Sequence, residues 1–84
     1  MSDTTNQGPS QALYFVREDG SRWTVSHSGA EYPYQTRDMA IGAAVDAANT
    51  SGKRGHDARV HIRGDGQEWQ IVWRYGLDPY PPTW

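Results

Sequence analysis

The centre of the chain reads Thr36-Arg37-Asp38-Met39-Ala40-Ile41-Gly42-Ala43-Ala44-Val45-Asp46-Ala47-Ala48. The apolar residues of this stretch recur with the spacing of one buried helix face: Ile41, Ala44, Val45 and Ala48. Thr36 can cap the helix through its hydroxyl, and Asp38 lies in the first turn, where the helix dipole favours a carboxylate. The pattern predicts one Ala-rich helix that stops at Gly52. Because alanine is small, this helix can lie close to a sheet.

On both sides of the helix, apolar residues alternate with polar ones, which is typical of strands with one buried face. Before the helix, the alternation predicts strands at 13–16 and 22–27 and an extended piece at 31–34, where proline fits only an edge. After the helix, it predicts two strands around the turn at Gly64-Asp65-Gly66. The predicted fold is therefore α+β in two layers, an antiparallel sheet of four to five short strands with one Ala-rich helix on one face, in the order β-β-(β)-α-β-β.

The same alternation predicts which sheet residues form the core. In the two strands after the helix, the residues expected to face it are Val60, Ile62, Trp69, Ile71 and Trp73. In the first hairpin, Trp23 and Val25 are expected on that side. Three tryptophans would then fill the space under the alanine face of the helix, and each would bury a large apolar area.

The two ends of the chain differ in composition from its centre. Residues 1–11 are mostly small and polar, and we expect them to be a disordered leader to a single domain over residues 12–76. Residues 77–84 hold three prolines, which predicts an extended tail that packs on the domain or on another chain. The candidate contact residues of the tail are Tyr75, Tyr80 and Trp84.

The composition excludes several classes of protein. Aromatic residues make up 12% of the 84 residues, which is more than a disordered chain carries. The absence of cysteine excludes a disulfide scaffold and a thiolate metal site. No run approaches the roughly 18 apolar residues of a membrane span, and the N-terminus lacks the features of a signal peptide. We therefore expect a cytoplasmic protein that does not contact a membrane.

The charged residues point to a surface on the sheet face away from the helix. Seven of the eight basic residues are arginine, which suits paired and stacked contacts, although the net charge is −2. The candidate binding residues of this face are Arg22, Arg59, His61, Arg63 and Arg74. Gln70 is expected beside them, and Tyr14 is the only expected aromatic residue there. Such a face could contact nucleic-acid phosphates or an acidic protein partner. Alternatively, it is solvated and its arginines pair with nearby carboxylates of Glu18, Asp19, Glu31 and Glu68.

No set of residues has the spacing of a catalytic or metal site. His56 and His61 would lie on a loop and on a strand, which is not the same-face helical pair of zinc hydrolases. In Ser26-His27-Ser28, neighbouring side chains on a strand point to opposite faces. We therefore expect no enzymatic activity, no metal and no cofactor.

Several short motifs occur together along the chain. They are Trp23-x-Val25, Thr36 before Ala40-Ile41 and Ala44, Ala47-Ala48, Val60, Asp65-Gly66, and the closing Tyr75-Gly76-x-Asp78-Pro79-Tyr80-Pro81-Pro82. In these motifs the chain resembles the bacterial family catalogued as domain of unknown function 2188, over roughly residues 13 to 82. The closing stretch is the most specific, whereas the loop from Gly52 to Asp57 is longer and more basic than the family pattern. The resemblance implies a short domain without an established activity or catalytic residues.

Two functions follow from the sequence, and neither identifies a partner. The first is a small non-enzymatic interaction module that could self-associate as a homodimer, because a domain of this size gains much from extra buried area. The second is a small nucleic-acid-binding domain that uses the Arg-bearing sheet face.

Overall fold

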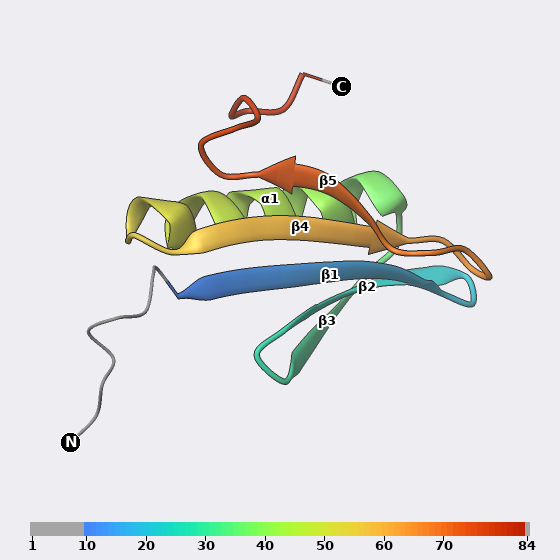
Figure 1. Cartoon of the computed structure of the whole chain (residues 1–84). Coiled ribbons are helices and arrows are strands. Elements are labelled where there is room, and N and C mark those ends of the chain that lie inside the picture. The colour runs from blue at the N-terminus through green and yellow to red at the C-terminus, as the bar shows by residue number, and fades with distance from the viewer. Residues whose placement is uncertain (1–9, 84) are drawn as a thin grey trace.

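One helix packs on one face of a five-stranded sheet, so the α+β class predicted from the sequence is confirmed (Figure 1). The computed structural model describes residues 10–83. The elements in chain order are β1 (Gln11–Asp19), β2 (Arg22–His27), β3 (Ala30–Tyr34), α1 (Arg37–Lys53), β4 (Asp57–Arg63) and β5 (Gln70–Arg74). Most of the expected leader, residues 1–9, lies outside the described residues, and Gln11 already belongs to β1.

The strands are arranged in the order β3-β2-β1-β4-β5, with β3 and β5 at the edges. Pro33 thus lies on an edge strand, as the sequence predicts. The prediction of a purely antiparallel sheet is wrong at the centre, where β1 pairs with β4 in parallel, from Gln11↔Asp57 to Arg17↔Arg63. The two antiparallel pairings of β1 with β2 and of β2 with β3 give β3 the direction of β1. The helix α1 is then a crossover from β3 to β4, and because such a crossover joins parallel strands, β4 runs parallel to β1.

The start of α1 agrees with its sequence signals, and its end does not. Thr36 Oγ1 accepts a hydrogen bond from the backbone N–H of Met39 at 3.1 Å, which confirms the predicted cap. The helix continues past Gly52 to Lys53, and Gly55 adopts the positive φ of 97° that follows the helix end. The predicted stop at Gly52 is therefore wrong. Gly52 is needed inside the helix because a Cβ there would overlap the ring of Tyr75.

The core lies between α1 and the sheet. From the helix it takes the predicted face, with Ala44 and Ala48 fully buried, so the alanines do bring the two layers close. From the sheet, its largest fully buried side chain is Trp73, and Trp23 packs at its margin. The remaining buried apolar residues of the sheet are Ala12, Tyr14, Val16, Val25, Ala58, Val60 and Ile62.

An irregularity between β4 and β5 reverses part of the predicted inner face. Val60 is opposite Trp73, but its neighbour His61 is opposite Ile71, so one residue of β5 is left over between these pairs. Such a bulge shifts the alternation of side chains by one position. Every residue of this hairpin arm on the far side of the bulge from Trp73 therefore lies on the face opposite to the one that regular alternation predicts.

The predictions for three residues of the second hairpin are wrong for this reason. Ile71 and Trp69 are 45% and 40% exposed, on the sheet face away from α1. Gln70, expected on that outer face, is instead opposite the buried Ile62.

The chain reverses its direction after β5 (Figure 1). The indole Nε1–H of Trp73 donates to the carbonyl oxygen of Pro79 at 2.9 Å. The Tyr80 hydroxyl donates to Asp46 Oδ1 on α1 at 2.7 Å, and this hydrogen bond raises the pKa of Tyr80 above its ordinary value. Residues 78–80 therefore cover the side of the core formed by Trp73.

Candidate functional site

The sheet face away from α1, here called the open face, carries a group of aromatic and aliphatic side chains. We call this group the outer cluster and define it as Phe15, His61, Trp69 and Ile71. The rings of Phe15 and His61 are stacked with centroids 5.0 Å apart, and the ring of Trp69 meets that of Phe15 edge-on at 5.2 Å. Ile71 is the cross-strand partner of His61. The four side chains therefore form one surface across β1, β4 and β5.

The strand pattern explains why these side chains point outward. On β1, Tyr14 and Val16 are buried toward the helix, so the intervening Phe15 lies on the open face. On β4, Val60 and Ile62 are buried in the same way, which leaves His61 on the open face beside Phe15. The bulge then brings the β5 side of the second hairpin into the same group.

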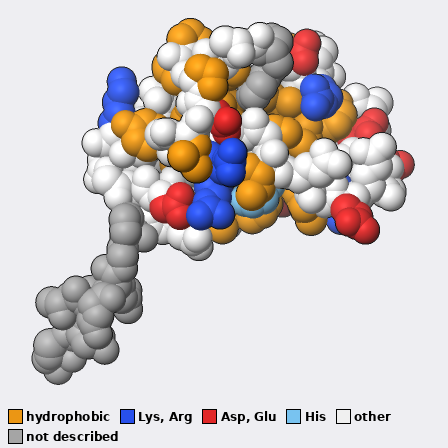
Figure 2. All heavy atoms as spheres, turned by 45° about the horizontal axis from the view of Figure 1, so that its top comes forward, with side chains coloured by type: hydrophobic (Ala, Val, Ile, Leu, Met, Phe, Trp, Pro, Cys, Tyr) orange, Lys and Arg blue, Asp and Glu red, His pale blue; other side chains and the backbone are white. Residues whose placement is uncertain are grey.

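Arginine side chains surround the outer cluster. The guanidinium carbon of Arg63 lies 5.0 Å from the centre of the Trp69 ring, within the range of a cation–π contact. Arg59 and Arg74 are cross-strand partners on the same face. Figure 2 shows cationic side chains among hydrophobic ones over the middle of the molecule, with a histidine beside them.

Three of the four arginines that β1, β4 and β5 carry on the open face form ion pairs with neighbouring carboxylates. The three ion pairs are Arg59 with Asp57 at 3.0 Å, Arg17 with Glu31 at 3.3 Å and Arg74 with Asp78 at 3.5 Å. The hydrogen bonds from Arg59 hold the pKa of Asp57 below its ordinary value. Within residues 10–83, the fourth, Arg63, has no carboxylate at ion-pair distance. The open face is therefore close to electrically balanced.

His61 has an unusual environment at the centre of the outer cluster. Its Nδ1 atom is buried, and no described residue makes a hydrogen bond to it. Burial lowers the pKa of His61, and the positive charge of Arg59 lowers it further. Both effects favour the neutral form of the ring, which is compatible with an apolar surface.

The structure brings together four of the five binding residues predicted from the sequence. Arg59, His61, Arg63 and Arg74 share the open face of β4 and β5. Arg22 does not join them, because it begins β2, beyond the central strand, and lines a separate hollow near Pro33.

The other candidate residues that the structure describes lie away from the open face. Tyr14 is buried under the helix, where its hydroxyl is hydrogen bonded to Ser51, so it is no part of an exposed stacking surface. Tyr75 and Tyr80 contact α1 instead, and Trp84 lies outside the described residues.

The aromatic part of the site was not predicted from the sequence. Phe15, Trp69 and Ile71 were either unassigned or expected in the core. One signal was present: Leu13-Tyr14-Phe15-Val16 is an unbroken apolar run, and such a run indicates a strand with apolar residues on both faces. The bulge has no comparable signature in the sequence.

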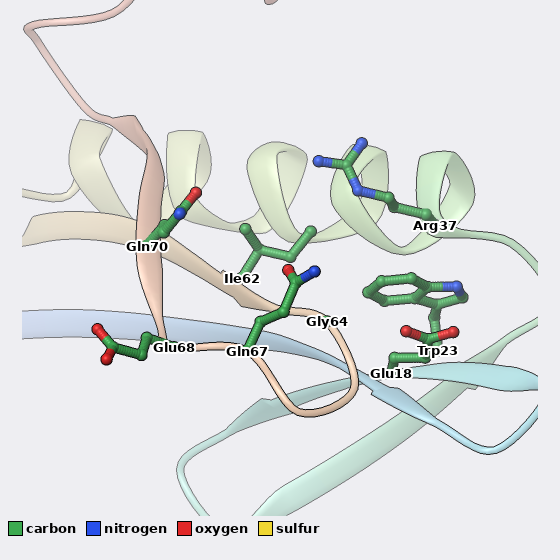
Figure 3. Close-up of a pocket in the computed structure, with 8 residues that line it drawn as sticks. All are labelled: Glu18, Trp23, Arg37, Ile62, Gly64, Gln67, Glu68 and Gln70. Atoms are coloured by element: carbon green, nitrogen blue, oxygen red, sulfur yellow. The ribbon is translucent and has the colours of Figure 1, made fainter.

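Two hollows lie on the helix side of the sheet. One, of about 220 Å³, has polar walls; in Figure 3 Arg37 lies above the Trp23 ring and Glu18 below it, with Gln67 reaching in from the β4–β5 loop. Glu18 is already engaged, since its Oε1 accepts the backbone N–H of Asp65 at 3.0 Å. The other hollow, of about 270 Å³, is lined mainly by aromatic residues and by helix alanines: Tyr14, Val25, His27, Tyr32, Tyr34, Ala43 and Ala47.

The residues that could support catalysis or metal binding are dispersed or already engaged. His27 Nδ1 lies 2.9 Å from the carbonyl oxygen of Leu13, which can only accept, so the ring donates there and its Nε2 faces Ser28 Oγ at 3.3 Å. In the row of contacts from Ser28 through His27, the third group is thus the backbone carbonyl of Leu13, where a catalytic triad has a carboxylate. Among the described residues, no three His, Asp or Glu side chains converge on a point where a metal could bind. No helix in the described part of the chain is long and apolar enough to cross a membrane.

Comparison of the chain with family models, with curated proteins and with solved structures gave no match. The resemblance to the domain of unknown function 2188 family therefore stays a prediction.

Proposed function

We propose that the chain is a non-enzymatic interaction module and that the open face of its sheet contacts another protein. The observation that carries the proposal is the outer cluster: Trp69 and Ile71 are large, apolar and 40–45% exposed on a sheet face that no helix within residues 10–83 covers. Protein interfaces combine an apolar, aromatic centre with arginine and a polar rim, and the open face has this composition. A cytoplasmic location belongs to the same proposal and rests on the sequence alone.

The charge distribution supports a protein partner over nucleic acid. Binding to a phosphate backbone depends on cations that are free to replace counterions. Among the described arginines of β1, β4 and β5, only Arg63 has no ion pair, and it covers the Trp69 ring. The whole chain is acidic as well, with a net charge of −2. The exposed aromatic rings are the one feature that favours the nucleic-acid alternative, because bases can stack on them.

The non-enzymatic part of the proposal rests on the histidines. His27 faces a serine but is held by a backbone carbonyl, and His61 lies in an apolar cluster. In the described part of the chain, no carboxylate joins either histidine in the geometry of an acid–base relay.

Site-specific photocrosslinking tests the proposal. A photoreactive amino acid replaces Ile71 on the open face or, as a control, Thr50 on the exposed side of α1. We expect protein adducts from position 71 only, and we expect Trp69→Ser to remove them. Equal adducts from both positions would contradict a role for the open face.

A second experiment tests whether the open face binds nucleic acid and not a protein. Fluorescence anisotropy with labelled single-stranded DNA and RNA is measured at low and high salt. We expect no salt-dependent binding. Binding that weakens steeply with salt and is lost when Arg59, Arg63 and Arg74 are replaced together would favour nucleic acid over a protein partner.

A further inference from the structure

The outward side chains of β4 are Asp57, Arg59, His61 and Arg63, and the two at the ends carry opposite charges, so the ends of the strand are complementary to each other when it is reversed, with Arg59 then facing the neutral ring of His61. Asp57 begins the strand and Arg63 ends it, and each lies three residues from Val60. Both point to the open face, because Ala58, Val60 and Ile62 between them are buried toward α1. If a second β4 were laid over the first in the opposite direction, each carboxylate would meet a guanidinium.

We propose that the protein partner of the open face is a second copy of this chain, packed sheet on sheet about a two-fold axis that crosses β4 at Val60. The axis lies between the two sheets and runs across the strands, so that β4 covers β4 of the second copy in the antiparallel sense. A two-fold contact of this kind uses the same patch on both copies, and each favourable pair occurs twice.

The register of β1 fits the same axis. Phe15 is opposite His61 and Leu13 is opposite Arg59 in the parallel pairing of β1 with β4. The rotation that places Asp57 over Arg63 therefore also places Phe15 over Leu13 of the second copy. Both are apolar residues on the open face, and His61 and Ile71 come to lie over Arg59 and Arg74 of the second copy, whose aliphatic stems can cover them.

The two charges are able to make the contact. Arg63 is exposed and has no carboxylate partner among residues 10–83. Asp57 already accepts two hydrogen bonds from Arg59, at 3.2 and 3.0 Å, but a carboxylate has room for further donors. Its side chain is 38% exposed, so a second guanidinium can approach it.

This inference rests on the proposed function, since it names the partner of the same face. Its test is sedimentation velocity of the full chain over a wide range of concentrations, with the variants Asp57→Arg and Arg63→Asp. Each variant alone places like charges over one another twice, and we expect dimerisation about tenfold weaker. When the two variants are mixed, opposite charges face one another at both positions, and we expect the mixture to dimerise as the unchanged chain does.

Two further variants serve as controls. Arg22→Asp makes the same charge change as Arg63→Asp but lies outside the outer cluster, and we expect it to leave dimerisation unchanged. Arg63→Gln removes the charge without reversing it and should weaken dimerisation less than Arg63→Asp. Thermal melting of each variant shows that it is folded before it is compared.

Three outcomes would overturn the inference, and they separate it from the proposed function. A chain that stays monomeric at all concentrations excludes the second copy but leaves the crosslinking test of the open face standing. A dimer weakened by Ile71→Ser but not by the charge variants keeps the open face and rejects the two-fold axis at Val60. A dimer that none of these variants changes contradicts both the axis and the open face as the contact surface.

Discussion

Trp73 and Trp69 have opposite roles although both belong to the same predicted strand face. Trp73 is fully buried and hydrogen bonded, whereas Trp69 is 40% exposed on the open face. We expect Trp73→Ala to cost about 3–5 kcal/mol in the free energy of unfolding and Trp69→Ala about 1 kcal/mol. Urea unfolding at a protein concentration low enough to avoid association measures both values. Equal losses in the two variants would show that the bulge is misplaced.

His61 makes stability depend on pH. Its pKa is lowered in the folded state, first by burial and then by Arg59, from an ordinary value of 6.5. As the pH falls below 6.5, the unfolded chain binds the proton before the folded chain does. The stability that comes from the neutral His61 is therefore fully present above pH 6.5 and is lost as the pH falls through the pKa of the folded state.

The pH prediction has a matched control. We expect the melting temperature to fall between about pH 7.5 and about pH 5, and we expect the fall to be smaller in His61→Gln. The other histidines are the same in both proteins, so the difference between the two profiles belongs to His61. Identical profiles would show that His61 is not held in its neutral form.

At the scale of the elements, two glycines of α1 provide a matched pair. Gly52 faces the Tyr75 ring, and a Cβ there would overlap it, whereas nothing lies within 4 Å of a Cβ at Gly42. We expect Gly42→Ala to stabilise the fold by about 0.5–1 kcal/mol through helix propensity, and Gly52→Ala to destabilise it by about 1–3 kcal/mol. Chemical denaturation tests both, and the loss from Gly52→Ala should largely disappear when Tyr75 is also replaced by alanine. A stabilising Gly52→Ala would contradict the close packing of the helix on Tyr75.

Signals confined to one element predicted that element well. The hydroxyl of Thr36 and the spacing of Ile41 and Ala44 place the helix start and its buried face, because both depend only on neighbours along the chain. Pro33 likewise marks an edge strand, since it lacks the N–H that a central strand needs.

Features that depend on pairs of distant segments were not predicted. The parallel pairing of β1 with β4 follows from the direction in which α1 returns the chain, and the role of Gly52 from Tyr75, 23 residues later. The bulge is set by how β5 meets β4, and a shift of one residue moved Ile71 from the expected core to the open face. The candidate site depends on that shift, so the sequence supplied its arginines but not its aromatic centre.

At the scale of the whole molecule, the C-terminal segment completes the core. Removal of all residues after Leu77 takes away the Pro79 carbonyl and leaves the buried Trp73 N–H without an acceptor. We expect this truncation to lower the free energy of unfolding by about 1–3 kcal/mol. Truncation after Tyr80 keeps both tail contacts and should cost much less. Equal melting temperatures for the two truncated chains would show that residues 78–80 do not stabilise the core.

The central claim is that the open face, with the outer cluster at its middle, is the surface through which the molecule associates. The most direct measurement is fluorine NMR of the chain labelled with fluorotryptophan, with each resonance assigned by a tryptophan-to-phenylalanine variant. We expect the Trp69 resonance to shift as the chain concentration rises, while that of the buried Trp73 stays fixed. If dimers form in sedimentation while the Trp69 resonance does not move, the association surface lies elsewhere on the molecule and the claim is wrong.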